Sequence, residues 1–410
     1  MQFRLMRPGF LNAHRVATLL VAALLALVVL AALLIWWAGR ARSADFVEYR
    51  MSVPTDIPTA VAVAPDGAVW FSIDFSDAVG VVRNGKVERI VKGSRSVEPI
   101  GIAVDTAGTT WITNAATVSI VAVSAAGEER SVKLGTPIAR LGRMTAAPDG
   151  SVWFAESTAY SITRLLNGEL ARHHFDSARG GPYGVAVAPD GAVWATLQSG
   201  NALLRMGPDG RMTEHEIPAP GVLPTDIAVD ATGAVWFLEF RTDRIGRLKG
   251  GKFEEFSIAH DKAGLTGLAV APDGAVWFGL LRKGSLGRLK DGKVVEFRLP
   301  RVDARPYSVA VDRQGAIWYA DISGYVGMLP ASHCSSRLPT AAATTPTATS
   351  TAAKPTLNAN TPNSPTMTLP SASARIRRLS ARGSGTRPPA IPSPIRTKRL
   401  GRRSMTAVRS

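Results

Sequence analysis

Two carboxylates and a histidine stand in this sequence where a recurring pattern could bring their side chains together. Glu239 and Asp321 each lie three residues after a tryptophan, and His260 lies between them in a polar stretch. An imidazole can abstract a proton near neutral pH, and carboxylate oxygens are the ligands that hard divalent cations prefer. These side chains could therefore serve acid–base chemistry or bind a cation, provided that the fold places them on one face.

Aromatic and charged side chains that could bind a ligand accompany them. Our candidate ligand-binding residues are Tyr183, Asp226, Arg241 and Arg305, with Tyr307 close by. Polar groups that converge on a concave surface are the default position of a binding site. Further polar residues at comparable places in the pattern are Glu98, Glu156, Asp261, Arg282 and Lys283.

Several of these residues also have a structural interpretation, which the sequence leaves open. A single histidine in a polar loop, such as His260, can simply be solvated. Glu156 and Glu239 could accept hydrogen bonds from inner loops. The Asp-Gly pairs are expected to form tight hairpin turns rather than to bind calcium, because both residue types suit such turns. These pairs begin at Asp66, Asp149, Asp190 and Asp273.

A repeat of about 41 residues positions all of these side chains. Its marker is a series of tryptophans spaced 41 or 42 residues apart: Trp70, Trp111, Trp153, Trp194, Trp236, Trp277 and Trp318. Around each, two short β-rich runs flank an Asp-Gly or similar pair, and two further runs follow. Four strands per repeat without helical periodicity predict one propeller blade per repeat. The expected fold is all-β, a seven-bladed β-propeller of four-stranded antiparallel blades.

The two ends of the repeat region predict how the ring closes. After residues 326–329 the fourth-strand pattern is missing, and the chain turns into Pro, Ala and Ser. The missing pattern occurs instead at residues 46–51, which resemble residues 294–299. We therefore expect the first strand to pair into the last blade, which leaves no free sheet edge. The propeller is expected to span residues 45–330.

An apolar segment precedes the repeats. From Val16 to Trp37 there are 22 consecutive residues of which only Thr18 is polar. As a helix this segment would be about 33 Å long, enough to cross a hydrocarbon core of about 30 Å. The alternative is a cleaved signal peptide, whose apolar stretch is usually about 7–15 residues. We predict a cytoplasmic stub and one transmembrane helix within residues 1–44, with the propeller on the periplasmic or extracellular side of a bacterial cytoplasmic membrane.

The basic charge of the chain resides at its two ends. Residues 1–44 and 331–410 hold five and thirteen Lys or Arg and no Asp or Glu, which leaves residues 45–330 with a net charge of −2 out of a total of +16. A nucleic-acid-binding domain needs a basic face, so no nucleic acid partner is expected. Residues 331–410, rich in Thr, Pro and Ala and then in Arg, are expected to be a disordered tail. A lone cysteine, Cys334, excludes an intrachain disulfide.

The blade sequence is similar to that of a known family. The fifth repeat carries much of its signature, Asp226-Ile-Ala-Val-Asp-Ala-Thr-Gly-Ala-Val-Trp-Phe-Leu-Glu239, followed by Arg244-Ile-Gly-Arg-Leu248. Over residues 46–330 the chain resembles the virginiamycin B lyase family. The resemblance implies a seven-bladed propeller and an enzyme that opens the ring of streptogramin B antibiotics at its ester linkage, by elimination and with Mg²⁺.

The resemblance also implies where the reacting groups should lie. In the family's pattern a histidine follows a Pro in the loops that enter the last two blades, and these positions hold Thr266 and Tyr307. The family's metal-binding Glu, two residues before the second histidine, corresponds to Arg305. The carboxylate after the seventh repeated tryptophan corresponds to Asp321, within one position of register.

These departures define the candidate site. His260 is a candidate catalytic base in place of the missing histidines, with Asp261 or Asp321 to orient it. Tyr307 is the second candidate catalytic residue. The candidate ligands of the Mg²⁺ that the resemblance implies are Glu239 and Asp321.

Two functions follow from the sequence. The first is a platform that binds a small-molecule or protein ligand on the loop face of the propeller, with a degenerate lyase site. The alternative is a metal-dependent eliminating lyase that acts on cyclic depsipeptides of the streptogramin B type or on lactone-like substrates. A purely structural envelope protein is a third. The chain is expected to be a monomer attached to the membrane through its N-terminal helix.

Overall fold

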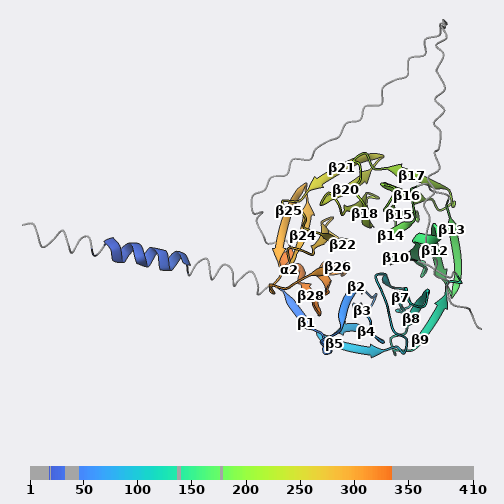
Figure 1. Cartoon of the computed structure of the whole chain (residues 1–410), viewed down its shortest axis with the longest axis horizontal. Helices are drawn as coiled ribbons and strands as arrows, with labels where there is room; N and C mark the ends of the chain where they lie inside the picture. Colours follow the sequence, from blue (N-terminus) through green and yellow to red (C-terminus); the bar gives the residue numbers. More distant parts are fainter. Residues whose placement is uncertain (1–17, 19, 33–45, 136–139, 176–178, 335–410) are drawn as a thin grey trace, which may run out of the picture. The chain divides into compact units, whose positions relative to one another are not determined.

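Repeated strands of the chain form a closed ring of blades (Figure 1). The structure, a computed structural model, describes residues 18, 20–32, 46–135, 140–175 and 179–334. Within these residues the strands form seven four-stranded antiparallel sheets. The seven-bladed all-β propeller predicted from the tryptophan period is therefore confirmed.

The blades are numbered along the chain. Blade 1 contains β2 (Ile57–Val63), β3 (Val69–Asp74), β4 (Ala78–Arg83) and β5 (Lys86–Val91), and blade 2 contains β6 (Ile102–Val104), β7 (Thr110–Asn114), β8 (Ser119–Val123) and β9 (Glu129–Lys133). Blade 3 contains β10 (Leu141–Ala146), β11 (Val152–Glu156), β12 (Ser161–Leu166) and β13 (Glu169–His174), and the short 3₁₀ helix η1 (Ser157–Ala159) follows β11. Blade 4 contains β14 (Pro182–Val187), β15 (Val193–Leu197), β16 (Ala202–Met206) and β17 (Met212–Glu216).

The last three blades repeat the same order. Blade 5 contains β18 (Pro224–Val229), β19 (Val235–Glu239), β20 (Arg244–Lys249) and β21 (Lys252–Ser257). Blade 6 contains β22 (Leu265–Val270), β23 (Val276–Leu280), β24 (Ser285–Lys290) and β25 (Lys293–Arg298). Blade 7 contains β26 (Pro306–Val311), β27 (Ile317–Asp321), β28 (Tyr325–Leu329) and β1 (Val47–Arg50), and the short helix α2 (Ala331–Cys334) follows β28.

The ring closes by pairing its first strand with its last. Strand β1 lies antiparallel to β28, with Val47 opposite Met328 and Arg50 opposite Tyr325. In Figure 1 the blue β1 accordingly lies beside the orange β28. Strand β28 ends at Leu329, close to the expected end of the propeller. Because strands from both ends of the repeat region form blade 7, the edge of β28 is covered by β1 and is not left unpaired.

Tryptophan packing explains why the repeat folds into blades. Trp236 on β19 is buried in one cluster with Phe256 of its own blade and with Leu265 and Phe278 of blade 6. Burying a large apolar side chain stabilises a fold by about 1.5–3 kcal/mol. The exposed edge of the ring is capped by Arg247 on β20, whose Cζ lies 5.1 Å from the indole centroid. Each blade thus packs on the next through its tryptophan.

The turns between the first two strands follow the Asp-Gly chemistry expected from the sequence. At β22–β23, Asp273 accepts a hydrogen bond from the backbone N–H of Ala275 at 3.0 Å, and Gly274 has a φ of 78°. Only glycine adopts that φ without strain. In this turn the aspartate serves hairpin formation.

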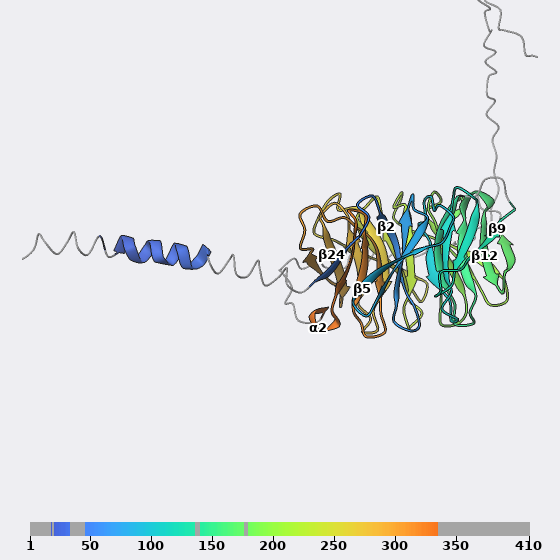
Figure 2. The same cartoon turned by 90° about the horizontal axis from the view of Figure 1, so that it is seen from below.

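Two kinds of loop open on one face of the ring, which we call the mouth face. They are the loops between second and third strands and those from a fourth strand to the next first strand. Figure 2, which views the ring from its side, shows the strands running between this face and the opposite one. In every blade the first strand is innermost, so residues at its start lie both near the ring axis and near the mouth face.

The two ends of the chain are described only in part. Residues 20–32 are helical. Among the described residues, none of the helices combines the length and the apolar character needed to cross a membrane. The predicted membrane anchor includes residues 16, 17, 19 and 33–37, which lie outside the described residues, as does most of the predicted disordered tail.

Candidate functional site

The first strands of the blades surround a central channel. One residue position on each of these strands lies close to the first strand of an adjacent blade. It lies two residues before the residue that pairs with the repeated tryptophan, as Asp226 does relative to Ala228 opposite Trp236. In five blades the side chain at this position is small: Ala60, Gly101, Gly184, Gly267 and Ser308. At Gly184 a Cβ atom would lie 2.5 Å from the carbonyl oxygen of Thr225. Close strand packing therefore favours small residues there.

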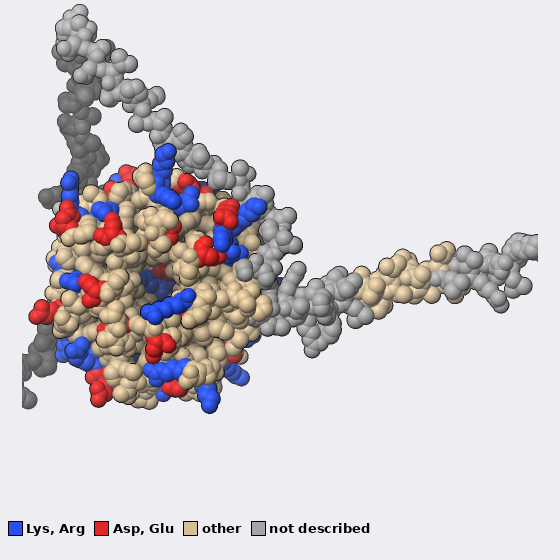
Figure 3. Space-filling view, turned by 180° about the vertical axis from the view of Figure 1, so that it is seen from behind, with Lys and Arg blue, Asp and Glu red and all other residues tan. Residues whose placement is uncertain are grey.

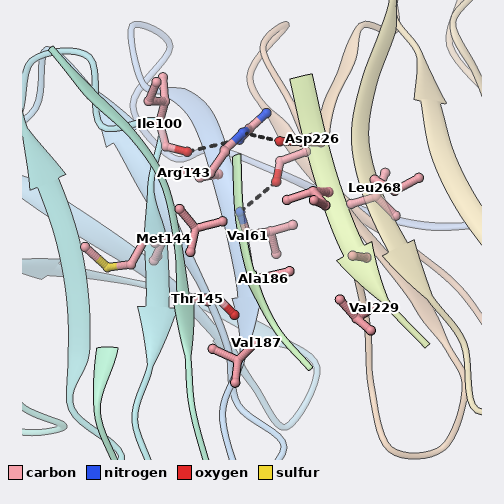
Figure 4. A pocket seen from close by; sticks show the side chains of 17 residues that line it. Val61, Ile100, Arg143, Met144, Thr145, Ala186, Val187, Asp226, Val229 and Leu268 are labelled. Carbon is pink, nitrogen blue, oxygen red and sulfur yellow. Dashed lines mark hydrogen bonds and ion pairs between the residues drawn. The ribbon is translucent and has the colours of Figure 1, made fainter. Parts of the chain in front are cut away.

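The other two blades place opposite charges at this position, Arg143 on β10 and Asp226 on β18. Nε of Arg143 lies 2.8 Å from Oδ1 of Asp226, and their side chains are only 13% and 11% exposed. Nη1 of Arg143 donates to the carbonyl oxygen of Ile100 at 3.0 Å. Figure 4 shows the guanidinium between these two partners. The pair links blades 3 and 5 across the channel, past Gly184 of blade 4.

The electrostatics of this ion pair keep Arg143 charged. Burial opposes its charged form, but the nearby Asp226 carboxylate outweighs that penalty and raises the pKa of Arg143. A buried pair of this kind is stable only when both charges find partners. The carbonyl of Ile100 supplies an additional acceptor for the guanidinium.

Two cavities are lined by this pair, and a third shares lining residues with the second of them. One of about 280 Å³ is lined by Arg143, Asp226 and channel residues such as Met144, Val187 and Val229, which Figure 4 shows to one side of the pair. The second, of about 250 Å³, is lined by Arg143, Asp226 and residues of blades 4 to 7. The third, of about 650 Å³, is lined by residues at the mouth-face ends of blades 1 to 4 and blade 7. The space-filling view of Figure 3 shows a hollow in the middle of the ring among scattered charged side chains.

Two tyrosines stand where the second and third cavities meet. Tyr183 on β14 and Tyr307 on β26 line both cavities. The guanidinium carbon of Arg143 lies 5.7 Å from the ring centroid of Tyr307. Burial raises the pKa of Tyr183, and Asp226 adds to that rise while Arg143 opposes it. Tyr183 therefore keeps its proton at neutral pH and can donate a hydrogen bond.

The structure thus brings together three of the residues singled out from the sequence, Tyr183, Asp226 and Tyr307. It adds Arg143, which the sequence reasoning missed. A signal for it was present, because Arg143 stands at a repeat position that is Gly, Ala or Ser in five blades. Comparing the repeats column by column would have singled out this arginine together with Asp226.

Comparison with known proteins places the chain. The profile of the virginiamycin B lyase family matches residues 85–351, more than half of the chain. The chain belongs to the virginiamycin B lyase family. It is 32% identical over 192 residues to the virginiamycin B lyase of Nocardia farcinica, covering 47% of this chain and 66% of that protein. It is 39% identical over 51 residues to the virginiamycin B lyase of Saccharopolyspora erythraea, covering 12% of this chain and 17% of that protein.

The matched part of the chain thus spans just under two thirds of the first relative and about a sixth of the second. Among solved structures, a catalytically inactive virginiamycin B lyase of Staphylococcus aureus with quinupristin is similar, with a TM-score of 0.66 and 23% identity over 70% of this chain and 98% of that one. A second structure, of a streptogramin B lyase, has a TM-score of 0.65 and 22% identity, covering 69% of this chain and 96% of that one. At this identity the two structures support the propeller fold alone.

The positions that the family resemblance assigns to histidines are accommodated differently here. Thr266 is buried, and its hydroxyl donates to the carbonyl oxygen of Pro306 at 2.7 Å. Tyr307 faces the cavities. His260 is not among the residues that line the three cavities, and its Nε2 lies 2.7 Å from Oε2 of Glu296. Glu296 is on β25, the outermost strand of blade 6, so the histidine is oriented by this carboxylate and not by Asp261 or Asp321.

Asp321 is fully buried and its hydrogen bonds are local. Its Oδ2 accepts from the backbone N–H of Arg305 at 2.9 Å and from Nη2 of Arg301 at 2.6 Å. Its Oδ1 accepts from the backbone and hydroxyl of Ser323 at 2.9 and 2.6 Å. Arg301 also binds Glu48 of β1 at 3.1 Å. These bonds brace the closure of the ring.

Glu239 is fully buried too, but makes no ion pair with the described residues. Its Oε2 accepts from the hydroxyl of Thr242 at 2.8 Å, while Oε1 has no partner among the described residues. The matching Glu156 of blade 3 is paired with Arg172 at 2.9 Å. In blade 5 the strand position of Arg172 is held by Glu255. Burial, reinforced by Glu255, raises the pKa of Glu239 to about 7, although the hydrogen bond from Thr242 and the charge of Arg244 oppose the rise.

The described residues do not fit the Mg²⁺ that the family resemblance implies. Glu239 is in blade 5 and Asp321 in blade 7, with blade 6 between them. Asp321 is already occupied by an arginine, and Glu239 is stabilised in its protonated form. Within the described part of the chain, His, Cys, Asp and Glu nowhere gather in a group of three that could hold a metal. We therefore derive no step through a metal ion.

The remaining two candidates lie on exposed loops. Arg241 follows β19 and Arg305 precedes β26, and both side chains are exposed. Neither is among the residues that line the three cavities. Arg305 contributes its backbone to Asp321, as described above. Their ligand-binding roles remain predictions.

Proposed function

We propose that this chain is a ligand-binding propeller of the virginiamycin B lyase family in which the lyase site is incomplete. One observation carries the proposal. Polar side chains that can bind and orient a ligand line the cavities, among them Arg143, Asp226, Tyr183 and Tyr307. The described residues that line these cavities include no histidine, and Asp74 and Glu98 at the mouth do not belong to a group of three side chains that could hold a metal.

The residue at the first histidine position supports this view. Abstracting a proton requires a group whose pKa lies near the working pH. The hydroxyl of Thr266 is a poor base, and it is already engaged as a donor to Pro306. His260, the candidate replacement, is held by Glu296 outside the cavities.

The size of the cavities suits a small-molecule ligand. Ligand pockets usually have volumes of about 300–1,000 Å³ and combine apolar walls with a few polar groups. The cavities of about 250 and 650 Å³ share Tyr183, Gln198 and Tyr307, so one ligand could extend across both. A protein segment that inserts a side chain into the mouth would use the same groups.

Location outside the cytoplasmic membrane is part of the proposal. It is supported by the apolar run from Val16 to Trp37 and by the absence of acidic residues before it. In cells that carry the full chain, protease added from outside should cleave the propeller of an exported protein.

A titration of the full chain with Mg²⁺, followed by calorimetry, tests the proposal. We expect no saturable binding, either near neutral pH or well above pH 7, where Glu239 with its pKa of about 7 is ionised. The matched variant is Glu239→Gln. Tight binding by the wild-type chain that this variant loses would restore a metal-dependent reaction.

A second candidate function is an eliminating lyase that uses Tyr307. It is favoured by the position of this phenol at the mouth, beside the Arg143 cation. A phenolate there could take a proton from the carbon adjacent to the one that bears the ester oxygen. The electrons of that C–H bond would form a C=C bond while the C–O bond breaks and the carboxylate leaves. Ring opening of a cyclic depsipeptide by the wild-type chain, abolished in Tyr307→Phe, would support this candidate.

A further inference from the structure

We propose that the 250 Å³ cavity is a subsite for a small aromatic or apolar carboxylate, with Arg143 as the group that recognises the anion. We call it the carboxylate pocket and define it by Arg143, Tyr183, Tyr307, Leu223, Phe240 and Leu281. The inference rests on the proposed binding function and adds the chemical class of the ligand.

The guanidinium of Arg143 is held in place before any ligand arrives. A guanidinium has five N–H donors. Its Nε side faces Asp226 at 2.8 Å, and Nη1 donates to Ile100 at 3.0 Å. This leaves donors for a ligand on a group that cannot turn freely. Fixed donors bind more tightly because little conformational entropy is lost on binding.

Two phenols complete the polar end of the pocket. Tyr183 and Tyr307 both lie close enough to Arg143 to interact electrostatically with it. Within the described residues neither hydroxyl makes a hydrogen bond, although both tyrosines line the pocket. The raised pKa of Tyr183 keeps its proton available. A carboxylate accepts several hydrogen bonds, and those from charged donors are the stronger ones.

The other walls determine what the carboxylate should be attached to. Leu223, Phe240 and Leu281 contribute apolar surface, and the rings of the two tyrosines add to it. Phe240 is 37% exposed without a ligand, so a ring seated against it would remove apolar surface from water. An aryl or branched alkyl group fits a space of this size and lining.

The charge of Asp226 predicts the direction in which a substitution changes the affinity for a carboxylate. Its carboxylate holds Arg143 in place, but it also repels an incoming anion. Replacing it by the isosteric Asn keeps a side chain that can accept a hydrogen bond and removes the negative charge. Carboxylate binding should therefore become tighter in Asp226→Asn, by about tenfold for a partly buried charge.

The test measures the affinity of the full chain for benzoate by ligand-observed NMR, with benzamide and benzylamine as matched probes. We expect benzoate to bind at least about tenfold more tightly than benzamide, because only benzoate carries a negative charge that forms an ion pair with the guanidinium of Arg143. Tyr183→Phe and Tyr307→Phe should each weaken benzoate binding. Tyr160→Phe, which changes a tyrosine outside the pocket, should have no effect.

The outcomes separate this inference from the proposed function. Equal binding of benzoate and benzamide, or preference for benzylamine, would overturn it and assign Arg143–Asp226 to bracing the blades or binding a cation. Weaker benzoate binding in Asp226→Asn would overturn it as well, unless circular dichroism shows an unfolded variant. In that event the double variant Arg143→Gln/Asp226→Asn decides, since it must lose the preference for benzoate. Failure here leaves the mouth open to other ligands, whereas bound Mg²⁺ would contradict the proposed function alone.

Discussion

Glu156 and Glu239 occupy equivalent positions of blades 3 and 5 but have opposite electrostatic surroundings. Both side chains are fully buried after the Trp-Phe pair of the second strand. Arg172 neutralises Glu156, whereas Glu255 stands at the matching position beside Glu239. The residue on the fourth strand of the blade thus distinguishes a carboxyl held in an ion pair, in blade 3, from one whose pKa is raised, in blade 5.

The raised pKa of Glu239 predicts how its contribution to stability depends on pH. Its pKa is about 7 in the folded chain and has an ordinary value of 4.5. The raised pKa therefore contributes its full stabilisation of the folded state below about pH 4.5, and this stabilisation is lost as the pH rises through about 7. Melting temperatures should therefore fall as the pH rises from about 4.5 to about 7 in the wild-type chain and level off above that range. The fall should be less steep in Glu239→Gln.

The matched control is Glu156→Gln, which leaves Arg172 without its partner. This variant should melt at a lower temperature at neutral pH and keep the slope that Glu239 causes. Parallel melting curves against pH for the wild-type chain and Glu239→Gln would contradict the assignment.

Among the secondary-structure elements, β1 is held by a side chain outside its own strand as well as by its pairing with β28. Arg301 lies in the loop between β25 and β26 and binds Glu48 of β1 and Asp321 of β27. Its guanidinium also lies over the ring of Tyr325 on β28. One arginine therefore holds the N-terminal strand against the last blade.

Removing Arg301 should weaken the closure of the ring. Loss of one partner of a buried ion pair typically costs about 3–5 kcal/mol, because a charge is left buried. Arg301→Ala should lower the free energy of unfolding by such an amount in denaturant titrations, and speed amide exchange in β1. The comparison is Glu88→Ala, which removes a surface pair with Arg83 worth about 0–1 kcal/mol. Equal effects of the two substitutions would show that Arg301 does not hold the closure.

The blades were predictable from the sequence because their signal is periodic and local. The tryptophan series and the Asp-Gly turns recur at one spacing, and residues 46–51 repeat the fourth-strand pattern. The partners of Glu239 were not predictable to the same degree, since Glu255 faces it only through strand register. The position of His260 depends on a loop and on Glu296, 36 residues later, and a loop has no such periodicity.

At the scale of the whole molecule, an ion pair between blades 3 and 5 distinguishes this chain from a simple seven-fold repeat. Small residues occupy the equivalent first-strand position in five blades, and Arg143 and Asp226 occupy it in blades 3 and 5. The result is a mouth with a cation and phenols at its floor. Family membership accounts for the scaffold, and these substitutions account for the ligand chemistry that we propose, since a fold by itself does not determine function.

The most direct test of this account is a turnover assay with a type B streptogramin. The full chain is incubated with the antibiotic and Mg²⁺, and the product is analysed by chromatography and mass spectrometry. Elimination would yield a ring-opened isomer of unchanged mass. We predict that the antibiotic is recovered intact, whereas a virginiamycin B lyase used as the positive control opens it. Magnesium-dependent appearance of the isomer with this chain would contradict the central claim that its mouth binds ligands without lyase chemistry.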